Sequence, residues 1–394
     1  MPASLQQKVS PLNVPQTLAR ALEWHRQGRL DEAAGLYASI LTVRPDHFDA
    51  LHMLGVIKLE RGQLADALQL IAGAMRLKAP SPQILLNHGL VLNALNRHQD
   101  ALDSFDRAIK LKSKYSDAHI NRAAVLAVLG RDEEALQSCR KALALAPNSP
   151  EAHYNLGNSL RRLNRDGEAL TSFDRALALR PGYVNAHNNR GMALQEMKRF
   201  DEAVISYDRA LALQPNNADA YNNRGNAMTA LGRFDEALAS YDRALGQGDD
   251  AQVHYNRGNA LHQLKRYDEA VVSYDRALAL RADHVEAHNN RGSSLQELGR
   301  YDDALASCDR ALSMRPDDAK AHNSRGNILQ TLERYDEALA SYDRALTLRP
   351  NDTNALNNRG GVLQKLDRFD EAMESYDRAL AAQRSEAADG GGGN

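Results

Sequence analysis

The chain has 394 residues, of which 43% are hydrophobic but only 5% aromatic. Its apolar content is therefore mostly Ala and Leu, the strongest helix formers, and few residues favour strands. The 49 Lys and Arg residues nearly balance the 51 Asp and Glu residues, without a block of like charge. The composition argues against nucleic acid and anionic membranes as partners.

Two cysteines are too few for a disulfide scaffold, and no run reaches the roughly 18 apolar residues that a membrane-spanning helix needs. Residues 1–20 contain no apolar core of the signal-peptide type. We therefore expect a cytoplasmic protein.

A repeat of 34 residues dominates the sequence, and one step of 33 residues separates Gly225 from Gly258. The repeat predicts a disordered N-terminal arm over residues 1–13, repeat units over residues 14–386 and a flexible Gly-rich tail over residues 387–394. One Gly recurs in each unit after the first, with Ala123 in the single slot that lacks it. The eleven units are 14–47, 48–81, 82–115, 116–149, 150–183, 184–217, 218–250, 251–284, 285–318, 319–352 and 353–386.

Each unit has the pattern of two short helices. The first ends at a Gly or Asn before a basic residue, and the second opens with acidic residues that complement a helix N-terminus. With the first residue of a unit as place 1, place 20 is Ala in all eleven units and place 27 is Ala in ten. Large side chains such as Phe173 and Tyr241 stand between them at place 24. Small residues at these places predict closely packed helix pairs, so we predict an all-α solenoid.

These places resemble the tetratricopeptide repeat (TPR) family, and the resemblance implies eleven helix-turn-helix repeats in a right-handed superhelix. Two places depart from the family pattern. Place 7 is Arg in seven of the units from 116–149 onward, and we expect Asp174, Asp208 and Asp275 of the second helices to be among its partners. Place 4 is His in six units: His119, His153, His187, His254, His288 and His322.

The histidines do not predict a metal site, because equivalent residues of stacked repeats lie roughly 8 to 10 Å apart, whereas zinc ligands lie about 2 Å from the metal. Cys139 and Cys308 occupy place 24 and are interpreted as buried fillers. The sequence contains no phosphate-binding loop, HExxH, CxxC or nucleophile elbow. We therefore expect no enzymatic activity, no cofactor and no metal.

The informative residues are amides on the first helix of each unit, where places 6 and 9 lie at one face. An Asn side chain carries the donor and acceptor that match a peptide bond, and one Asn per repeat matches about every third residue of an extended chain. The sequence predicts an Asn-lined concave groove for extended or disordered segments of other proteins. The alternative is that these amides form hydrogen bonds with neighbouring helices or merely face water. The candidate residues are Asn87, Asn121, Asn155, Asn189, Asn223, Asn256, Asn290 and Asn358 at place 6, with Asn158, Asn226, Asn259 and Asn327 at place 9.

The Asn row at place 6 also resembles the substrate-recruiting TPR superhelix of O-GlcNAc transferases. That resemblance implies an alternative function, as the recruiting portion of such a glycosyltransferase whose catalytic domain is absent or separate. Ser324, Ala19 and Met53 depart from the row. TPR co-chaperones use Lys at place 5 to hold a terminal carboxylate, and place 5 is never Lys here. A carboxylate clamp of that type is not expected.

Two irregularities remain. The unit 218–250 ends with Gly246 and Gly248, which predict an interrupted second helix and a soft point, since Gly inside a helix costs about 1 kcal/mol relative to Ala. The last unit has no solvating helix after it, so we expect Ala372, Met373 and Leu380 to be partly exposed. Self-association through this uncapped end is one expected consequence.

Overall fold

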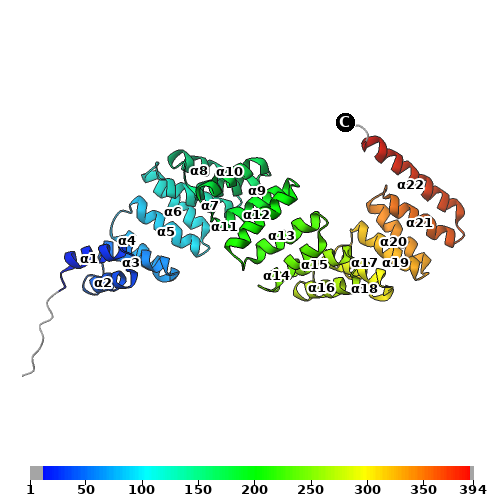
Figure 1. Cartoon of the computed structure of the whole chain (residues 1–394), viewed down its shortest axis with the longest axis horizontal. Helices are drawn as coiled ribbons and strands as arrows, with labels where there is room; N and C mark the ends of the chain where they lie inside the picture. The colour runs from blue at the N-terminus through cyan, green and yellow to red at the C-terminus, as the bar shows by residue number, and fades with distance from the viewer. Residues whose placement is uncertain (1–11, 391–394) are drawn as a thin grey trace, which may run out of the picture. The chain divides into compact units, whose positions relative to one another are not determined.

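The computed structural model describes the backbone of residues 12–390 and the side chains of residues 12–384. Over this part of the chain the regular structure consists of 22 α-helices and no strand. The 22 helices correspond to the eleven predicted units of two helices each, and the two helices of a unit, such as Pro82–Ala94 and His98–Leu111, pack against each other (Figure 1). Within the described residues, no helix is both long and apolar enough to cross a membrane. The right-handed winding stays a prediction.

The chain divides into two compact units, and the first covers Met1–Met197. Asn13 caps its first helix by accepting a hydrogen bond from the backbone N–H of Gln16, and Leu12 packs against the first core cluster. The predicted disordered arm therefore does not include these two residues, and residues 1–11 lie outside the described part. The helices are α1 (Val14–Arg26), α2 (Leu30–Val43), α3 (Phe48–Glu60), α4 (Leu64–Leu77), α5 (Pro82–Ala94), α6 (His98–Leu111), α7 (Ser116–Val128), α8 (Asp132–Leu145), α9 (Pro150–Arg162), α10 (Asp166–Leu179) and α11 (Val184–Glu196).

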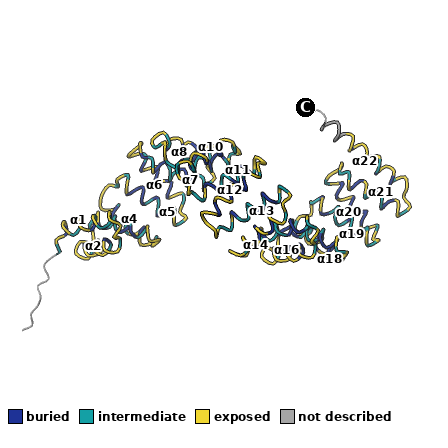
Figure 2. Tube along the Cα trace, viewed as in Figure 1, coloured by how far each residue is buried: buried dark blue, intermediate teal, exposed yellow. Residues whose placement is uncertain are grey.

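The second unit covers Lys198–Asn394. In both units the buried residues lie where helices face one another, and the outer surfaces are exposed (Figure 2). The helices of the second unit are α12 (Phe200–Leu213), α13 (Ala218–Ala230), α14 (Phe234–Leu245), α15 (Ala251–Gln263), α16 (Tyr267–Leu280), α17 (Val285–Glu297), α18 (Tyr301–Met314), α19 (Ala319–Thr331), α20 (Tyr335–Leu348), α21 (Thr353–Lys365) and α22 (Phe369–Gly390).

The two helices of a pair meet where the repeated Gly of the first faces the place-24 ring of the second. A Cβ added to Gly225 would lie 2.5 Å from Cε1 of Tyr241, closer than real contacts allow. Place 20 supplies a second close contact: Ala237 and Ala338, for example, are completely buried. The absence of a side chain on one helix thus makes room for a ring on the other.

Ala123, which replaces the repeated Gly, belongs to the unit whose place 24 is the small Cys139. The other cysteine shows why this combination fits, because a Cβ on Gly292 would lie 3.1 Å from Sγ of Cys308 rather than 2.5 Å from a ring atom. Both cysteines are buried and free, as predicted. Burial raises the pKa of each thiol to about 12.

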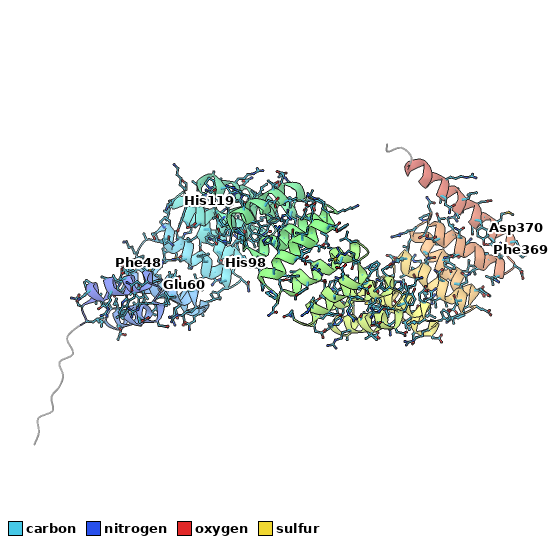
Figure 3. All side chains as sticks on the ribbon, in the orientation of Figure 1. Phe48, Glu60, His98, His119, Phe369 and Asp370 are labelled. Carbon is cyan, nitrogen blue, oxygen red and sulfur yellow. The ribbon has the colours of Figure 1, made fainter. Side chains whose placement is uncertain are left out.

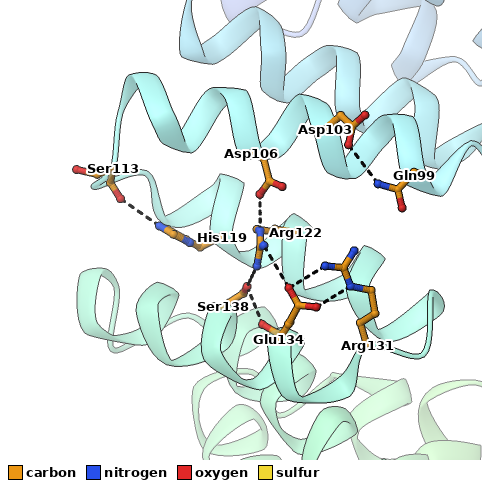
Figure 4. A network of polar contacts seen from close by, with 9 residues as sticks. All are labelled: Gln99, Asp103, Asp106, Ser113, His119, Arg122, Arg131, Glu134 and Ser138. Atoms are coloured by element: carbon orange, nitrogen blue, oxygen red, sulfur yellow. Dashed lines mark hydrogen bonds and ion pairs between the residues drawn. The ribbon is translucent and has the colours of Figure 1, made fainter.

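Neighbouring pairs are joined by the Arg at place 7. Arg122 of α7 donates from Nε to Oδ1 of Asp106 on α6 at 2.6 Å and from Nη1 to Oγ of Ser138 on α8 at 2.7 Å (Figure 4). Ser138 donates in turn to the backbone carbonyl of Glu134. One guanidinium therefore ties three helices from two successive repeats, and we call this arrangement the junction clamp.

The predicted partners of these arginines are confirmed. Nε of Arg190 lies 2.6 Å from Asp174, that of Arg224 lies 2.7 Å from Asp208, and that of Arg291 lies 2.6 Å from Asp275. The same ion pair forms at Arg257, Arg325 and Arg359.

The two charged residues of the clamp occur together in the sequence, which we call the sequence rule of the clamp. Every unit with Asp at place 25 is followed by a unit with Arg at place 7, apart from the last unit, which has none after it. Where place 25 is not acidic, the following place 7 is not Arg. These pairs of residues are Ala38 with Leu54, Ala72 with His88, and Arg140 with Leu156.

The short unit 218–250 is irregular in the predicted place. Helix α14 has 12 residues, whereas its neighbours α12 and α16 have 14, and it ends before Gly246. Asp250 then caps α15 by accepting from the backbone N–H groups of Gln252 and Val253. The interruption of the helix is confirmed, and the soft point stays a prediction.

The last pair corrects two expectations. Met373 and Leu380 are exposed as predicted, but Ala372 is only 1% exposed. Place 20 packs inside its own pair and needs no following repeat. Helix α22 also runs through Gly390, so residues 387–390 continue the helix instead of starting a flexible tail. Residues 391–394 of the predicted tail lie outside the described part.

We expect Gly225→Ala to lower the free energy of unfolding by about 1 to 3 kcal/mol, because the new methyl group overpacks against Tyr241. Gly292→Ala is the matched control, since its methyl group faces the smaller Cys308, and it should cost less. Urea unfolding followed by circular dichroism measures both variants. Equal losses would show that the ring does not set the size of the place-8 residue.

Candidate functional site

The amides of places 6 and 9 meet across the junctions between repeats. Nδ2 of Asn290 on α17 donates to Oδ1 of Asn259 on α15 at 2.9 Å and to the hydroxyl of Tyr255 at 3.2 Å. The place-6 Asn of one repeat thus bonds the place-9 Asn of the repeat before it. The same pairing joins Asn189 to Asn158, Asn256 to Asn226 and Asn358 to Asn327.

A tyrosine of the second helix completes three of the four bridges, whereas the unit of Asn158 has Phe173 at that place. The hydroxyl of Tyr274 donates to Oδ1 of Asn259 at 2.9 Å, so this oxygen accepts two hydrogen bonds. Nδ2 of Asn259 and Oδ1 of Asn290 have no hydrogen-bond partner among the described residues. The bridge of Asn290 with Asn259 therefore uses the donor side of one amide and the acceptor side of the other, and leaves one donor and one acceptor for a ligand; the bridge of Asn358 with Asn327 does the same. In the other two bridges Oδ1 of the place-6 residue already accepts a hydrogen bond, Asn189 from Asn188 and Asn256 from Gln252.

The remaining candidate residues do not form such bridges. Asn87 is buried and bonds His52, Asn121 donates to the backbone carbonyl of Asp117 in its own helix, and Asn155 donates to the backbone carbonyl of Ile120. Asn223 is half-buried and engaged in contacts of its own. The place-6 row is thus not uniform: the bridges are characteristic of the later repeats.

One cavity of about 460 Å³ coincides with the amide bridge between α15 and α17. We call it the bridge cavity. A larger cavity of about 710 Å³ lies between the loop before α21 and Gln383, away from the amides. The bridge cavity is lined by Thr229, Phe234, Asn259, His262, Gln263, Tyr274, Asn290, Ser293 and Lys320.

His262 is held in a defined orientation within the bridge cavity. Its Nδ1 lies 2.8 Å from Oγ of Ser294, and that hydroxyl donates its single proton to the backbone carbonyl of Asn290. Nδ1 must therefore carry the proton given to Ser294, which leaves Nε2 as an acceptor. Burial lowers the pKa of His262, and Lys320 lowers it further against the opposing effect of Glu297. The imidazole is neutral at neutral pH.

Lys320 supplies the charge of this cavity. It is exposed at place 2 of α19 and forms no ion pair with a described residue. Thr229 and His262 stand at place 12, which is Gln in four other units, and Lys320 stands at a place that is often acidic. These residues are not among the candidates predicted from the sequence, although their departure from the repeat is visible in it.

The histidines of place 4 have a structural role. Nε2 of His153 lies 2.9 Å from the backbone carbonyl of Pro147, six residues earlier, and His322 makes the same contact to Pro316. His254 instead contacts the carboxylate of Asp249 in the irregular loop. Among the residues that the structure describes, no group of three His, Cys, Asp or Glu side chains is placed to hold a metal ion.

The paired helices, the Gly-to-ring contact and the joined junctions define a helical repeat solenoid. Models of the tetratricopeptide repeat match residues 25–85, 86–150, 150–183, 182–247, 289–353 and 323–388, and a further TPR repeat model matches residues 258–299. The chain is therefore a tetratricopeptide repeat protein. No curated protein matches it.

One solved structure agrees with this fold, and two others are similar to parts or most of the chain. A tetratricopeptide repeat protein from Parabacteroides merdae aligns with a TM-score of 0.50 and 20% identity over 63% of this chain and 98% of its own. YrrB, described as a TPR protein with an unusual peptide-binding site, is 26% identical over 47% of this chain and 95% of its own, with a TM-score of 0.42. Yeast Tom70 is 15% identical over 95% of this chain and 96% of its own, also with a TM-score of 0.42.

Asn290→Ala should lower the free energy of unfolding by about 0.5 to 1.5 kcal/mol, because it removes a hydrogen bond between repeats. Gln263→Ala is the matched control, since Gln263 lines the same cavity, is exposed and bonds no described residue. Thermal melting followed by circular dichroism compares the two. If both variants melt like the unchanged chain, the bridges add nothing to stability.

The unfolding free energy should fall as the pH drops from about 7.5 to 5. Burial lowers the pKa of the imidazoles below the ordinary 6.5, so the unfolded chain binds more protons in this window. Their contribution is complete above 6.5 and is lost as the pH falls through the folded values. Urea titrations at several pH values measure the slope, and joint replacement of His52, His119 and His288 by Asn should flatten it. A slope unchanged in that variant would contradict the assignment.

Proposed function

We propose that this chain is a protein-interaction scaffold that holds an extended segment of another protein against the amide bridges of its first helices. The bridge cavity carries this proposal. It offers the Nδ2 donor of Asn259 and the Oδ1 acceptor of Asn290, neither of which bonds a described residue. One donor beside one acceptor is the complement of a peptide group.

The spacing of the bridges fits an extended ligand. First helices of stacked repeats lie roughly 9 to 10 Å apart, and an extended chain rises about 3.3 Å per residue, so each bridge meets about every third residue. Asn327 and Asn358 form the next bridge of this type along the second unit after Ser324 interrupts the row. Backbone recognition of this kind tolerates many side chains.

The bridge cavity adds a preference for acidic side chains. Lys320 is its one charged lining residue, because His262 is neutral near pH 7. A Glu or Asp of the bound segment would lie beside the ammonium group of Lys320 and the side-chain amide of Gln263. Binding would give the ammonium group of Lys320 a carboxylate partner, at a surface where the amides of the bridge already orient the peptide.

This role is non-enzymatic, because hydrogen bonds and one ion pair suffice for it. The alternative role, as the recruiting portion of an O-GlcNAc-transferase-like glycosyltransferase, uses the same bridges and stays a prediction. Glycosyl transfer to a bound peptide by the purified chain, or with a catalytic partner, would separate the two.

We expect a selection from random unstructured peptides, with the full chain as bait, to enrich segments that contain Asp or Glu. Fluorescence anisotropy then measures their affinity for the unchanged chain and for the double variant Gln263→Ala with Lys320→Ala. Both residues are exposed and outside the bridges, so the fold should persist. The double variant should bind at least about tenfold more weakly, a difference of 1.4 kcal/mol.

The matched control is Arg310→Ala, which removes the same charge from an exposed place on the second helix α18. It should leave the affinity unchanged. Replacing the acidic residue of a selected peptide with its amide should reproduce the loss in the unchanged chain but have no further effect in the double variant. Selected peptides that bind all three proteins equally would place recognition outside the bridge cavity and refute the proposal.

A further inference from the structure

The outer face of α22 exposes three large apolar side chains. Phe369 is 61% exposed, Met373 59% and Leu380 47%. Figure 3 labels Phe369 and Asp370 at the start of this helix, and Figure 2 shows exposed residues recurring along it. The corresponding places of α20 behave differently: Leu339 and Leu346 are 8% and 7% exposed because α21 packs against them. The exposed face of α22 therefore carries apolar residues at the places that, in α20, are covered by the first helix of the following repeat.

The same face carries half of a junction clamp. Asp377 stands at place 25, where the equivalent Asp343 binds Arg359 of the next repeat at 2.6 Å. Asp377 is exposed and forms no ion pair with a described residue. By the sequence rule of the clamps, Asp at place 25 is accompanied by Arg at place 7 of the repeat that follows.

The other half of a clamp lies on α1. Arg20 stands at place 7 of the first repeat, is exposed, and forms no ion pair with a described residue. Its guanidinium carbon lies 4.3 Å from the ring centroid of Trp24. Trp24 occupies place 11, where later repeats such as those of Leu295 and Leu329 bury an apolar side chain completely. Helix α1 thus has the cation and the apolar residue of a first helix that follows another repeat.

We propose that α1 of a second copy of this chain packs on the exposed face of α22, so that Arg20 of one copy binds Asp377 of the other. This contact would repeat the internal junctions between copies. Trp24 would cover Met373, as Leu363 covers Leu339, and the first turn of α1 would lie over Leu380, as Ala355 and Leu356 lie over Leu346. Such a contact is heterologous and leaves a free α1 and a free α22, so it propagates into rings or open chains of copies.

The charges favour this contact over pairing of two α22 faces. A symmetric α22 contact would bring the uncompensated Asp377 residues to one interface and leave Arg20 unused. In the head-to-tail contact each carboxylate meets a guanidinium, the geometry already present at Arg291 and Asp275. Like charges across an interface oppose association, whereas opposite charges select partner and register.

Sedimentation velocity over a range of concentrations tests the proposal with the full chain. The unchanged chain should form species larger than a monomer, and these should grow with concentration. Arg20→Asp and Asp377→Arg should each abolish them, because each places like charges at the contact. The double variant Arg20→Asp with Asp377→Arg should regain them, and so should an equimolar mixture of the two single variants.

Arg310→Asp is the control, since it reverses an exposed arginine of α18 away from both ends, and it should assemble like the unchanged chain. Circular dichroism checks that every variant is folded. Three results would overturn the proposal: a monomer at all concentrations, association that Arg20→Asp leaves intact, or a charge-swapped double variant that stays monomeric. The second of these would identify pairing of two α22 faces.

Discussion

The junction between successive repeats is the contact on which this structure depends. A single helix pair cannot bury its apolar face alone, so a repeat array gains its stability from nearest neighbours. Here an Arg is drawn into the junction, where its side chain is only about one-fifth exposed, as for Arg122 and Arg190. A guanidinium in that position needs a carboxylate to offset its desolvation. This explains why Asp at place 25 and Arg at place 7 appear and disappear together along the chain.

Fixing the junction also fixes the amides. Because the clamp sets the position of each first helix on the pair before it, the place-6 Asn reaches the place-9 Asn of the neighbour. The amides then have two functions. The Nδ2 group of Asn290 holds the array together, whereas its Oδ1 group and Nδ2 of Asn259 remain for a ligand. If the amides only lined a groove, both ends of each amide would be free of hydrogen bonds within the protein. If they only held the repeats together, both ends would be engaged in such bonds.

The features that could be predicted from the sequence are those that recur with the 34-residue repeat. Helix pairs, the buried place-24 residues and the Arg–Asp partners recur with fixed spacing, so a single correct unit predicts the others. The sequence could not predict how the amides divide their hydrogen bonds, since an Asn has both donors and an acceptor, and the choice depends on where Tyr255 and Tyr274 place their hydroxyls. Ala372 was predicted wrongly because the absence of a following repeat was applied to a residue that packs within its own pair. Ala123 was predictable, since Cys139 stands opposite.

Near-identity of the repeats makes the departures informative. Duplication copies every residue, so a side chain shared by many repeats says little about ligands, whereas a change in one repeat arose after copying. Around the bridge cavity, side chains that differ from those of the adjacent repeats come from successive repeats and meet in space: Thr229, His262, Ser294 and Lys320. Ser294 stands where the neighbouring repeat has Ala260, and its hydroxyl is what orients His262. Independent changes in separate repeats would not be expected to bring a histidine and its hydrogen-bond partner together. Selection on one surface formed by several repeats would do so, and a ligand bound at the bridge cavity would cause such selection.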